Sequence, residues 1–304
     1  MSMSAICGLF GKTRQGWYKQ RSHVENKVLK EAVVVELVKE QRADMPKVGC
    51  RKLHYLLSPI LAEHSLSLGR DGLFDIVAAN GLQIRRRKRR KAITTDSNHP
   101  FRKYGNLVRE LVPDRSEQLW VSDITYIQLK GQYCYLSLIT DAYSRRIMGH
   151  CLWPSLKKEG PLQALSMALS SRTDKGLDLI HHSDRGLQYC CADYISKLNA
   201  SRISISMTEK GDPYENALAE RINGILKTEF GLDGRFESFE QAKLVVQKAI
   251  NVYNEQRPHA SIDYMTPQQA HQQNGVIATR WKARKRLQKQ WVNPEPLLTE
   301  SKDK

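Results

Sequence analysis

Apolar and polar residues follow two different patterns along the chain, and these patterns divide it into a helical part and a mixed part. In the first part, apolar residues recur at helical spacing with charged residues between them. This pattern predicts three helices, at 24–42, 50–64 and 69–81. With basic residues on the second helix, the part is similar to a helix-turn-helix DNA-binding module. A small helical bundle with a solvated basic face has the same pattern.

After Trp120 the pattern changes to short runs that are rich in β-branched and aromatic residues, as expected of strands. The run 177–184 is apolar nearly throughout, which is typical of a strand covered on both faces. The order of elements predicts an α/β fold with a mixed sheet and helices on its faces. The expected strands are 119–129, 133–145, 146–153, 177–184 and 203–208; the expected helices are 161–172, 192–201, 214–230 and 238–256.

A run of seven cations, "RRRKRRK", separates the two parts. These cations repel one another, so we expect an extended linker that contacts phosphates rather than a packed element. Its residues are Arg85, Arg86, Arg87, Lys88, Arg89, Arg90 and Lys91. The sequence therefore predicts a helical module at 1–84, a basic linker at 85–115, a mixed α/β core at 116–275 and a basic tail at 276–304.

The chain of 304 residues carries a formal net charge of +16 and has a sequence pI of about 9.6. Such a charge indicates a polyanionic partner, and nucleic acid fits better than an anionic membrane surface. No window approaches the roughly 20 apolar residues of a spanning helix, and the N-terminus lacks a signal-peptide pattern. We therefore expect a soluble cytoplasmic protein whose six cysteines are reduced.

Three acidic residues are candidates for chemistry: Asp123 inside the first strand, Asp184 at the end of the fourth, and Glu220 on a long helix. A charge in a strand needs a partner or a metal ion. Together the three carboxylates are suited to Mg²⁺, which prefers oxygen ligands, and two such ions can clamp a phosphodiester. Asp141 is a rival to Asp123, although an aspartate at a strand end commonly makes a turn.

The helix that carries Glu220 has a polar face formed by Asn216, Glu220, Asn223 and Lys227, at steps of four, three and four residues. The alternative is that Glu220 only faces water. Further on, Arg257 and His259 follow the last core helix, where they could contact phosphates or cap that helix.

The segment "LIHHSDRGLQYCC" suggests a zinc site at His181, His182, Cys190 and Cys191. Zinc sites usually take ligand pairs spaced two to four residues apart. Here the members of each pair are adjacent, and adjacent strand residues point to opposite faces. We therefore expect no structural zinc, and His182 is expected to pack or hydrogen-bond near Asp184.

Five segments, in order, resemble the motifs of insertion-sequence-three family transposases, bacterial DDE enzymes similar to retroviral integrases. They are "WVSDITYI", "DAYSRRIMG", "HSDRGLQY", "SMTEKGDPYENALAERINGILKTE" and "YNEQRPHASIDYMTP". The resemblance covers roughly residues 30–275 and is most specific from Trp120 to Pro267. Two positions depart from the family pattern: "VGCR" replaces a Tyr-Gly-Tyr-Arg-like signature, and Glu215 stands where Asp is more usual.

The resemblance implies an RNase H-like core whose catalytic and metal-binding acids are Asp123, Asp184 and Glu220, with 35 residues between the last two. It also implies that Lys227 and Asn216 bind the terminal DNA of the element. The cofactor would be two Mg²⁺ ions, with Mn²⁺ as a substitute. The partners would be double-stranded DNA (terminal inverted repeats and target), further copies of the chain, and a protein from an upstream reading frame. The location would be the cytoplasm, with the bacterial nucleoid.

The expected function is that of a DNA transposase, which hydrolyses a phosphodiester at an element end and joins the new 3′-hydroxyl to another phosphodiester. Two alternatives remain: an RNase H-like nuclease that cleaves without joining, and a DNA-binding relative without catalytic activity. The intact set of three acids argues against loss of catalysis, and the basic flanks argue against a small-molecule substrate.

Overall fold

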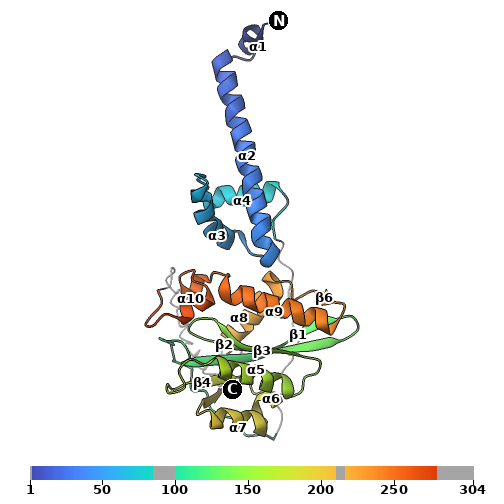
Figure 1. Cartoon of the computed structure of the whole chain (residues 1–304), viewed down its shortest axis with the longest axis vertical. Coiled ribbons are helices and arrows are strands. Elements are labelled where there is room, and N and C mark those ends of the chain that lie inside the picture. The colour runs from blue at the N-terminus through green and yellow to red at the C-terminus, as the bar shows by residue number, and fades with distance from the viewer. Residues whose placement is uncertain (1, 85–99, 210–215, 279–304) are drawn as a thin grey trace, which may run out of the picture.

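A computed structural model describes residues 2–84, 100–209 and 216–278 of the chain. A mixed sheet lies between two layers of helices, and a separate helical unit stands beyond one of these layers (Figure 1). A long helix of that unit projects away from the body and carries the N-terminal residues at its far end (Figure 1). None of the helices in the described ranges has the length and apolar character that crossing a membrane requires.

The helical unit contains α1 (Met3–Leu9), α2 (Arg14–Asp44), α3 (Cys50–Glu63) and α4 (Arg70–Ala79). The three predicted helices are confirmed, but the first begins earlier and α1 was not predicted. The side chain of Thr13 caps α2 by accepting a hydrogen bond from the backbone of Gly16. Residues 21–30 of α2 are exposed on all sides, so they lack the apolar stripe by which a sequence reveals a helix.

The sheet has the strand order β3-β2-β1-β4-β5, and β6 pairs with β1. The antiparallel strands β1, β2 and β3 come first, and β4 and β5 then add in parallel. The bounds are β1 (Leu119–Leu129), β2 (Tyr133–Asp141), β3 (Ile147–Trp153), β4 (Ile180–Ser183), β5 (Ser204–Met207) and β6 (Arg235–Phe236). Central β1 therefore contacts both the antiparallel and the parallel half of the sheet.

The helices α5 (Glu159–Ser171), α6 (Leu187–Cys190) and α7 (Ala192–Ala200) cover one face of the sheet. The other face is covered by α8 (Ala217–Glu229), α9 (Phe239–Glu255) and α10 (Pro267–His271), with a 3₁₀ turn at Ala260–Ile262 (Figure 1). On β1, Trp120 packs in the α5 and α7 layer, whereas Ile127 and Leu129 pack with α8 and α9. This alternation assigns odd-numbered residues of β1 to the α8 face.

These elements confirm the predicted fold class, an RNase H-like mixed sheet flanked by helices and preceded by a helical region. The five predicted strands and four predicted helices of the core are all present, with ends that differ by a few residues. The short elements α6, β6 and α10 were not predicted, because two to five residues are too few to show a periodic pattern.

The described half of the predicted linker, residues 100–115, lies along the core instead of forming a loose connection. The backbone of Leu107 donates to the side chain of Ser206, and Val108 and Leu111 pack beside Leu119. At its end, Arg115 forms a β-bridge with Asn274. This segment therefore packs with the core, whereas the sequence analysis assigned it to the linker. The difference arises because its few apolar residues have partners on the sheet.

The helical unit packs directly on the α8 and α9 layer. The backbone N–H of Lys47 donates to the carbonyl of Glu229, and the rings of Tyr55 and Tyr264 are stacked, with centroids 4.8 Å apart. Apolar residues of both parts form one continuous cluster. The helical unit therefore has a defined position on the core. The basic run between the two parts gave no sign of this contact.

Candidate active site

Asp123 and Asp184 lie in the same register on neighbouring parallel strands. β1 pairs with β4 so that Val121 is opposite His182. Two residues further along each strand, this register places Asp184, directly after β4, opposite Asp123. Paired positions on parallel strands point to the same face, and adjacent strands lie about 4.8 Å apart. The fold therefore brings these two carboxylates together on the α8 face.

A glycine leaves room for the carboxylate of Asp184. Oδ1 of Asp184 accepts a 3.0 Å hydrogen bond from the backbone N–H of Gly186. A Cβ atom at position 186 would come within 3.0 Å of the same oxygen. A side chain there would crowd the carboxylate, so Gly186 supports its position through close approach of the backbone.

Glu220 lies in the first turn of α8, on an exposed part of the helix. A negative charge is favourable there because the N-terminal end of a helix carries partial positive charge. α8 packs against β1, the strand that carries Asp123. The third predicted acid is therefore on the correct face of the sheet and open to solvent.

Asn223 connects α8 to the aspartate on β1. Its Nδ2 donates a 2.7 Å hydrogen bond to Oδ2 of Asp123, and Asn223 is only 5% exposed. Oδ1 of Asp123 accepts from the backbone of Ile124 at 2.9 Å. Because Asn223 is one turn beyond Glu220, this contact also fixes the rotation of the helix that carries the glutamate.

The pKa of Asp123 is raised from an ordinary value of 3.8 to about 7. Burial is the main cause, and the negative charge of Asp184 is the next. The hydrogen bond from Asn223 acts in the opposite direction, and the charge of Glu220 makes a smaller upward contribution. Both of the other predicted acids therefore act electrostatically on Asp123.

Among residues 2–84, 100–209 and 216–278, no three side chains of His, Cys, Asp or Glu are gathered as a ready set of metal ligands. The donor chemistry nevertheless fits a hard divalent cation, because Asp123 and Asp184 present carboxylate oxygens to the same region. A bound cation would offset the repulsion from Asp184, which adds to the effect of burial in raising the pKa of Asp123. The pair is the strongest candidate for holding Mg²⁺, and Glu220 is the third candidate.

Asp141, the rival to Asp123, has the predicted role in a turn. It is completely buried, and its Oδ1 accepts from the backbone N–H and the hydroxyl of Ser144, at 2.8 and 2.7 Å. Its Oδ2 accepts from the backbone of Glu117 at 2.7 Å. With both oxygens used to hold the chain, Asp141 is a structural residue.

The histidines and cysteines near Asp184 do not converge. On the α7 side of the sheet, Nε2 of His181 forms hydrogen bonds with the hydroxyl oxygens of Ser122 and Tyr194, at 2.6 and 2.9 Å. His182 makes a 2.8 Å hydrogen bond with Ser206 and is buried. The adjacent residues thus have different partners, as the strand geometry predicted.

Two predicted DNA-contact residues on α8 have different environments. Asn216 is 6% exposed, and its Nδ2 donates to the carbonyl of Ser122 at 3.0 Å, so direct contact with a DNA backbone does not fit this position. Lys227 is partly exposed, and its Nζ lies 3.9 Å from the centroid of the Tyr126 ring. Burial lowers the pKa of Lys227, and the charge of Asp123 opposes that change. Lys227 remains a candidate for phosphate contact.

The predicted phosphate contacts of Arg257 and His259 do not fit the structure, because both side chains are buried, at 3% and 5% exposure. Arg257 donates two hydrogen bonds of 2.8 Å to the carboxylate of Glu229. The ring of His259 contacts that of Tyr253 edge to face, and burial lowers the pKa of His259 well below its ordinary value. The structural alternative, in which they hold the end of α9, is the one that fits.

The remaining predicted contacts, Arg85 to Lys91, lie outside the described residues. The same is true of the C-terminal tail beyond residue 278. Their proposed role in DNA binding rests on charge alone and stays a prediction.

Comparison with known proteins identifies the core. Family models, both described as an integrase core domain, match residues 113–213 and 201–267. The chain is 33% identical over 266 residues to the insertion element IS600 uncharacterized 31 kDa protein of Shigella sonnei, covering 86% of this chain and 96% of that protein. It is 35% identical over 158 residues to transposase InsF for insertion sequence IS3fB of Escherichia coli strain K12, covering 52% of this chain and 54% of that one. The chain belongs to the insertion-sequence-three family of transposases.

The matches differ in extent. This transposase spans nearly all of the first relative and about half of the second. The HTLV-2 integrase catalytic core domain in complex with magnesium aligns with a TM-score of 0.42 and 19% identity, covering 52% of this chain and 97% of that one. The matched segments include all three acids, Asp123, Asp184 and Glu220.

For one residue of the site, the sequence predicted a position but no role. Asn223 was assigned to the polar face of its helix, but the hydrogen bond to Asp123 shows that this face is turned inward at that point. The spacing of three residues from Glu220 was the available signal. A buried amide so close to two acids in this transposase marks Asn223 as a positioning residue.

Proposed function

We propose that this transposase cleaves and joins the DNA ends of its insertion sequence by metal-dependent phosphodiester chemistry. The observation that carries the proposal is the register that sets Asp123 opposite Asp184, below a helix that presents Glu220. Family membership supports the choice of substrate class, because both family models describe an integrase core domain. The net charge of +16 supports a polyanionic substrate.

Asp123, Asp184 and Glu220 would hold two Mg²⁺ ions, or Mn²⁺ in their place. When bound, these ions supply charge stabilisation to the attacking and leaving oxygens of an in-line displacement. The residues of the chain then do the positioning. Asn223 holds Asp123, and the backbone of Gly186 holds Asp184, so neither aspartate has to reorganise when DNA binds.

Other parts of the proposal concern DNA and protein partners. Lys227 and the cations at 85–91 would neutralise phosphates of double-stranded DNA. The terminal inverted repeats and the target DNA would be brought together by several copies of the chain, with an upstream-frame protein as a further partner. The four-part organisation at 1–84, 85–115, 116–275 and 276–304 is kept with one change: residues 100–115 act with the core.

The test uses the purified full chain, Mg²⁺ or Mn²⁺, and oligonucleotides that carry the element ends. Cleavage and strand transfer are expected for the unmodified protein and should be lost in Asp123→Asn, Asp184→Asn and Glu220→Gln. Glu240→Gln is a matched control, because Glu240 is an exposed acid in the first turn of α9, as Glu220 is in α8. Circular dichroism confirms that each variant is folded.

Each alternative has its own outcome. Full activity in Glu220→Gln would show that the acid assignment is wrong. Cleavage that never produces joined strands would identify a nuclease. DNA binding without any metal-dependent chemistry would identify an inactive DNA-binding relative.

A further inference from the structure

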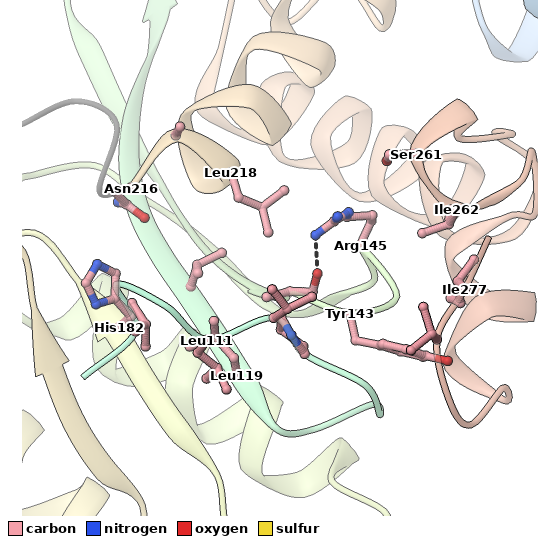
Figure 2. Close-up of a pocket in the computed structure, with 17 residues that line it drawn as sticks. Leu111, Leu119, Tyr143, Arg145, His182, Asn216, Leu218, Ser261, Ile262 and Ile277 are labelled. Atoms are coloured by element: carbon pink, nitrogen blue, oxygen red, sulfur yellow. Dashed lines mark hydrogen bonds between the residues drawn. The ribbon is translucent and has the colours of Figure 1, made fainter. Parts of the chain in front are cut away.

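A cavity of about 330 Å³ lies on the α8 face of the sheet, lined by residues of β1, β4 and α8 (Figure 2). Val121 and His182 line it, and each stands two residues before an acid on the same strand, Asp123 and Asp184 respectively. Since residues two apart on a strand share a face, the cavity continues the surface of the acidic site along β1 and β4. A molecule bound at the acidic site is therefore within reach of the cavity.

The walls of the cavity are mainly apolar. Leu111, Leu119, Val121 and Leu218 line it, and Figure 2 shows the side chain of Leu218 on α8 among them. Ligand sites commonly combine such walls with a few polar groups that fix orientation. The polar groups here are the features that indicate the ligand.

Asn216 presents an unsatisfied acceptor at the wall of this cavity. It is 6% exposed, and its Nδ2 is already used by the carbonyl of Ser122. No described residue donates to its Oδ1. A buried acceptor without a donor costs free energy, so a ligand with an N–H group would be stabilised at this point.

Arg145 supplies a second polar group from the opposite side of the cavity (Figure 2). Its guanidinium donates to the carbonyl of Ala142, but its Nε donates to no acceptor in the described residues. The backbone of Arg145 has a φ of 69°, an uncommon conformation for a non-glycine residue that the fold nevertheless maintains. The residues lining the cavity include this cation and no carboxylate, in contrast to the acidic site beside it.

We infer that the cavity takes one unpaired base of the DNA held at the acidic site, with an N–H group of the base donating to Oδ1 of Asn216. The inference rests on the proposed function, because it is the neighbouring phosphodiester that brings the nucleotide here. A base has flat apolar faces and a polar edge, which match the leucine walls and the Asn216 acceptor. Its anionic phosphate matches the guanidinium of Arg145. An aliphatic side chain would leave both polar groups unsatisfied.

The test compares two duplexes that differ in one group. Each ends in a single-nucleotide 3′ overhang, an unpaired adenine in one and an abasic residue in the other, and anisotropy measures binding to the full chain in Ca²⁺ buffer. The unmodified protein should bind the adenine overhang about tenfold more tightly, from one hydrogen bond and the burial of an apolar surface.

Two variants fill the cavity in different ways. Leu218→Trp places a large ring inside it, and Val276→Trp covers it from a lining position that is 88% exposed, where a substitution does not disturb folding. Both should reduce the tenfold preference to less than twofold. Leu244→Trp, at a position of α9 that is 73% exposed and outside the cavity lining, is the matched control and should keep the preference.

Equal affinity of the unmodified protein for both duplexes would overturn the inference, as would an undiminished preference in both tryptophan variants. The inference would also be overturned if the tryptophan variants changed the oligomeric state of the protein but kept its preference for the adenine overhang. The cavity would then receive a side chain from another copy of the chain. Strand transfer without base preference would remove only this inference. Base preference without strand transfer would remove the proposed catalysis and leave the cavity assignment in place.

Discussion

Asn223 of α8 donates a 2.7 Å hydrogen bond to Oδ2 of Asp123, at the centre of the sheet. The contact joins the helix that carries Glu220 to the strand that carries the first aspartate. Asn223 is buried, so its amide is held in place by packing as well as by this bond. The relative placement of two of the three acids therefore depends on one amide that is itself unable to bind a proton or act as a base.

We expect Asn223→Ala to weaken metal-dependent activity without abolishing it. Loss of the amide frees Asp123 to adopt other rotamers and removes a bond that favours its ionised form, so Mg²⁺ binding should weaken by about tenfold to a hundredfold. A Mg²⁺ titration of DNA cleavage measures the change. Saturating Mg²⁺ should restore most of the rate.

Thr228→Ala is the control for this substitution. Thr228 is exposed on the same helix, and its hydroxyl donates to the carbonyl of Gly224. An unchanged Mg²⁺ requirement in Asn223→Ala would mean that the hydrogen bond does not position the metal ligand.

The stability of the metal-free protein should fall as the pH rises from about 4 to about 7. Asp123 has a pKa of about 7 in the fold against an ordinary 3.8, so in this range the folded protein binds more protons than the unfolded chain. Stability decreases with pH wherever the folded state holds the extra proton. Thermal unfolding at a series of pH values in EDTA measures the effect.

Mg²⁺ should remove this pH dependence near neutrality, because a bound cation stabilises the ionised carboxylate. Asp123→Asn should remove it without metal. If Asp123→Asn kept the full decline between pH 4 and 7, another group would be responsible for it.

The elements that carry the site were predictable because their patterns are long and regular. Asp123 stands in an 11-residue strand that is rich in β-branched and aromatic residues. Glu220 stands on a 13-residue amphipathic helix. The register of β1 with β4 was not predictable, because β4 has only four residues and its pairing is a tertiary contact.

The sequence also could not distinguish exposed cations from buried ones. Arg257 and Lys227 are both basic residues in the core, yet Arg257 is 3% exposed and bound to Glu229, whereas Lys227 is partly exposed near Asp123. Glu229 lies 28 residues from Arg257 in the chain, and only the fold brings them together. The sequence alone therefore could not separate a DNA contact of Arg257 from its structural role.

Glu229→Gln should destabilise the protein by about 3–5 kcal/mol, because it leaves a buried guanidinium without its counterion. Glu229 also accepts from Lys52 of the helical unit, at 2.9 Å, so the same change loosens the unit from the core. Unfolding in urea measures the free energy, and limited proteolysis detects a loosened unit.

Lys248→Ala provides the comparison. The Lys248–Asp44 pair also joins the core to the helical unit, at 2.8 Å, but its side chains are 65% and 42% exposed. Removing it should cost no more than about 1 kcal/mol. Equal losses in the two variants would mean that burial of the Glu229 pair is unimportant.

DNA binding should weaken steeply with salt, and the cations at 85–91 should account for much of the slope. Each phosphate neutralised on duplex DNA contributes about 0.9 to the slope of log affinity against log salt. Neutral substitution of all seven cations should reduce the slope by up to about 6, and Lys227→Ala should reduce it by about 1. Anisotropy titrations at several salt concentrations give these values.

Lys248→Ala is again the control, because it removes one charge from a lysine that is paired with an aspartate. Its slope should stay close to that of the unmodified protein. An unchanged slope after substitution of 85–91 would exclude that run from the DNA interface and leave Lys227 and the other exposed cations of the chain to supply the phosphate contacts. A reduced slope with unchanged strand transfer at low salt would show that the run supplies affinity, while the acidic site performs the chemistry independently of it.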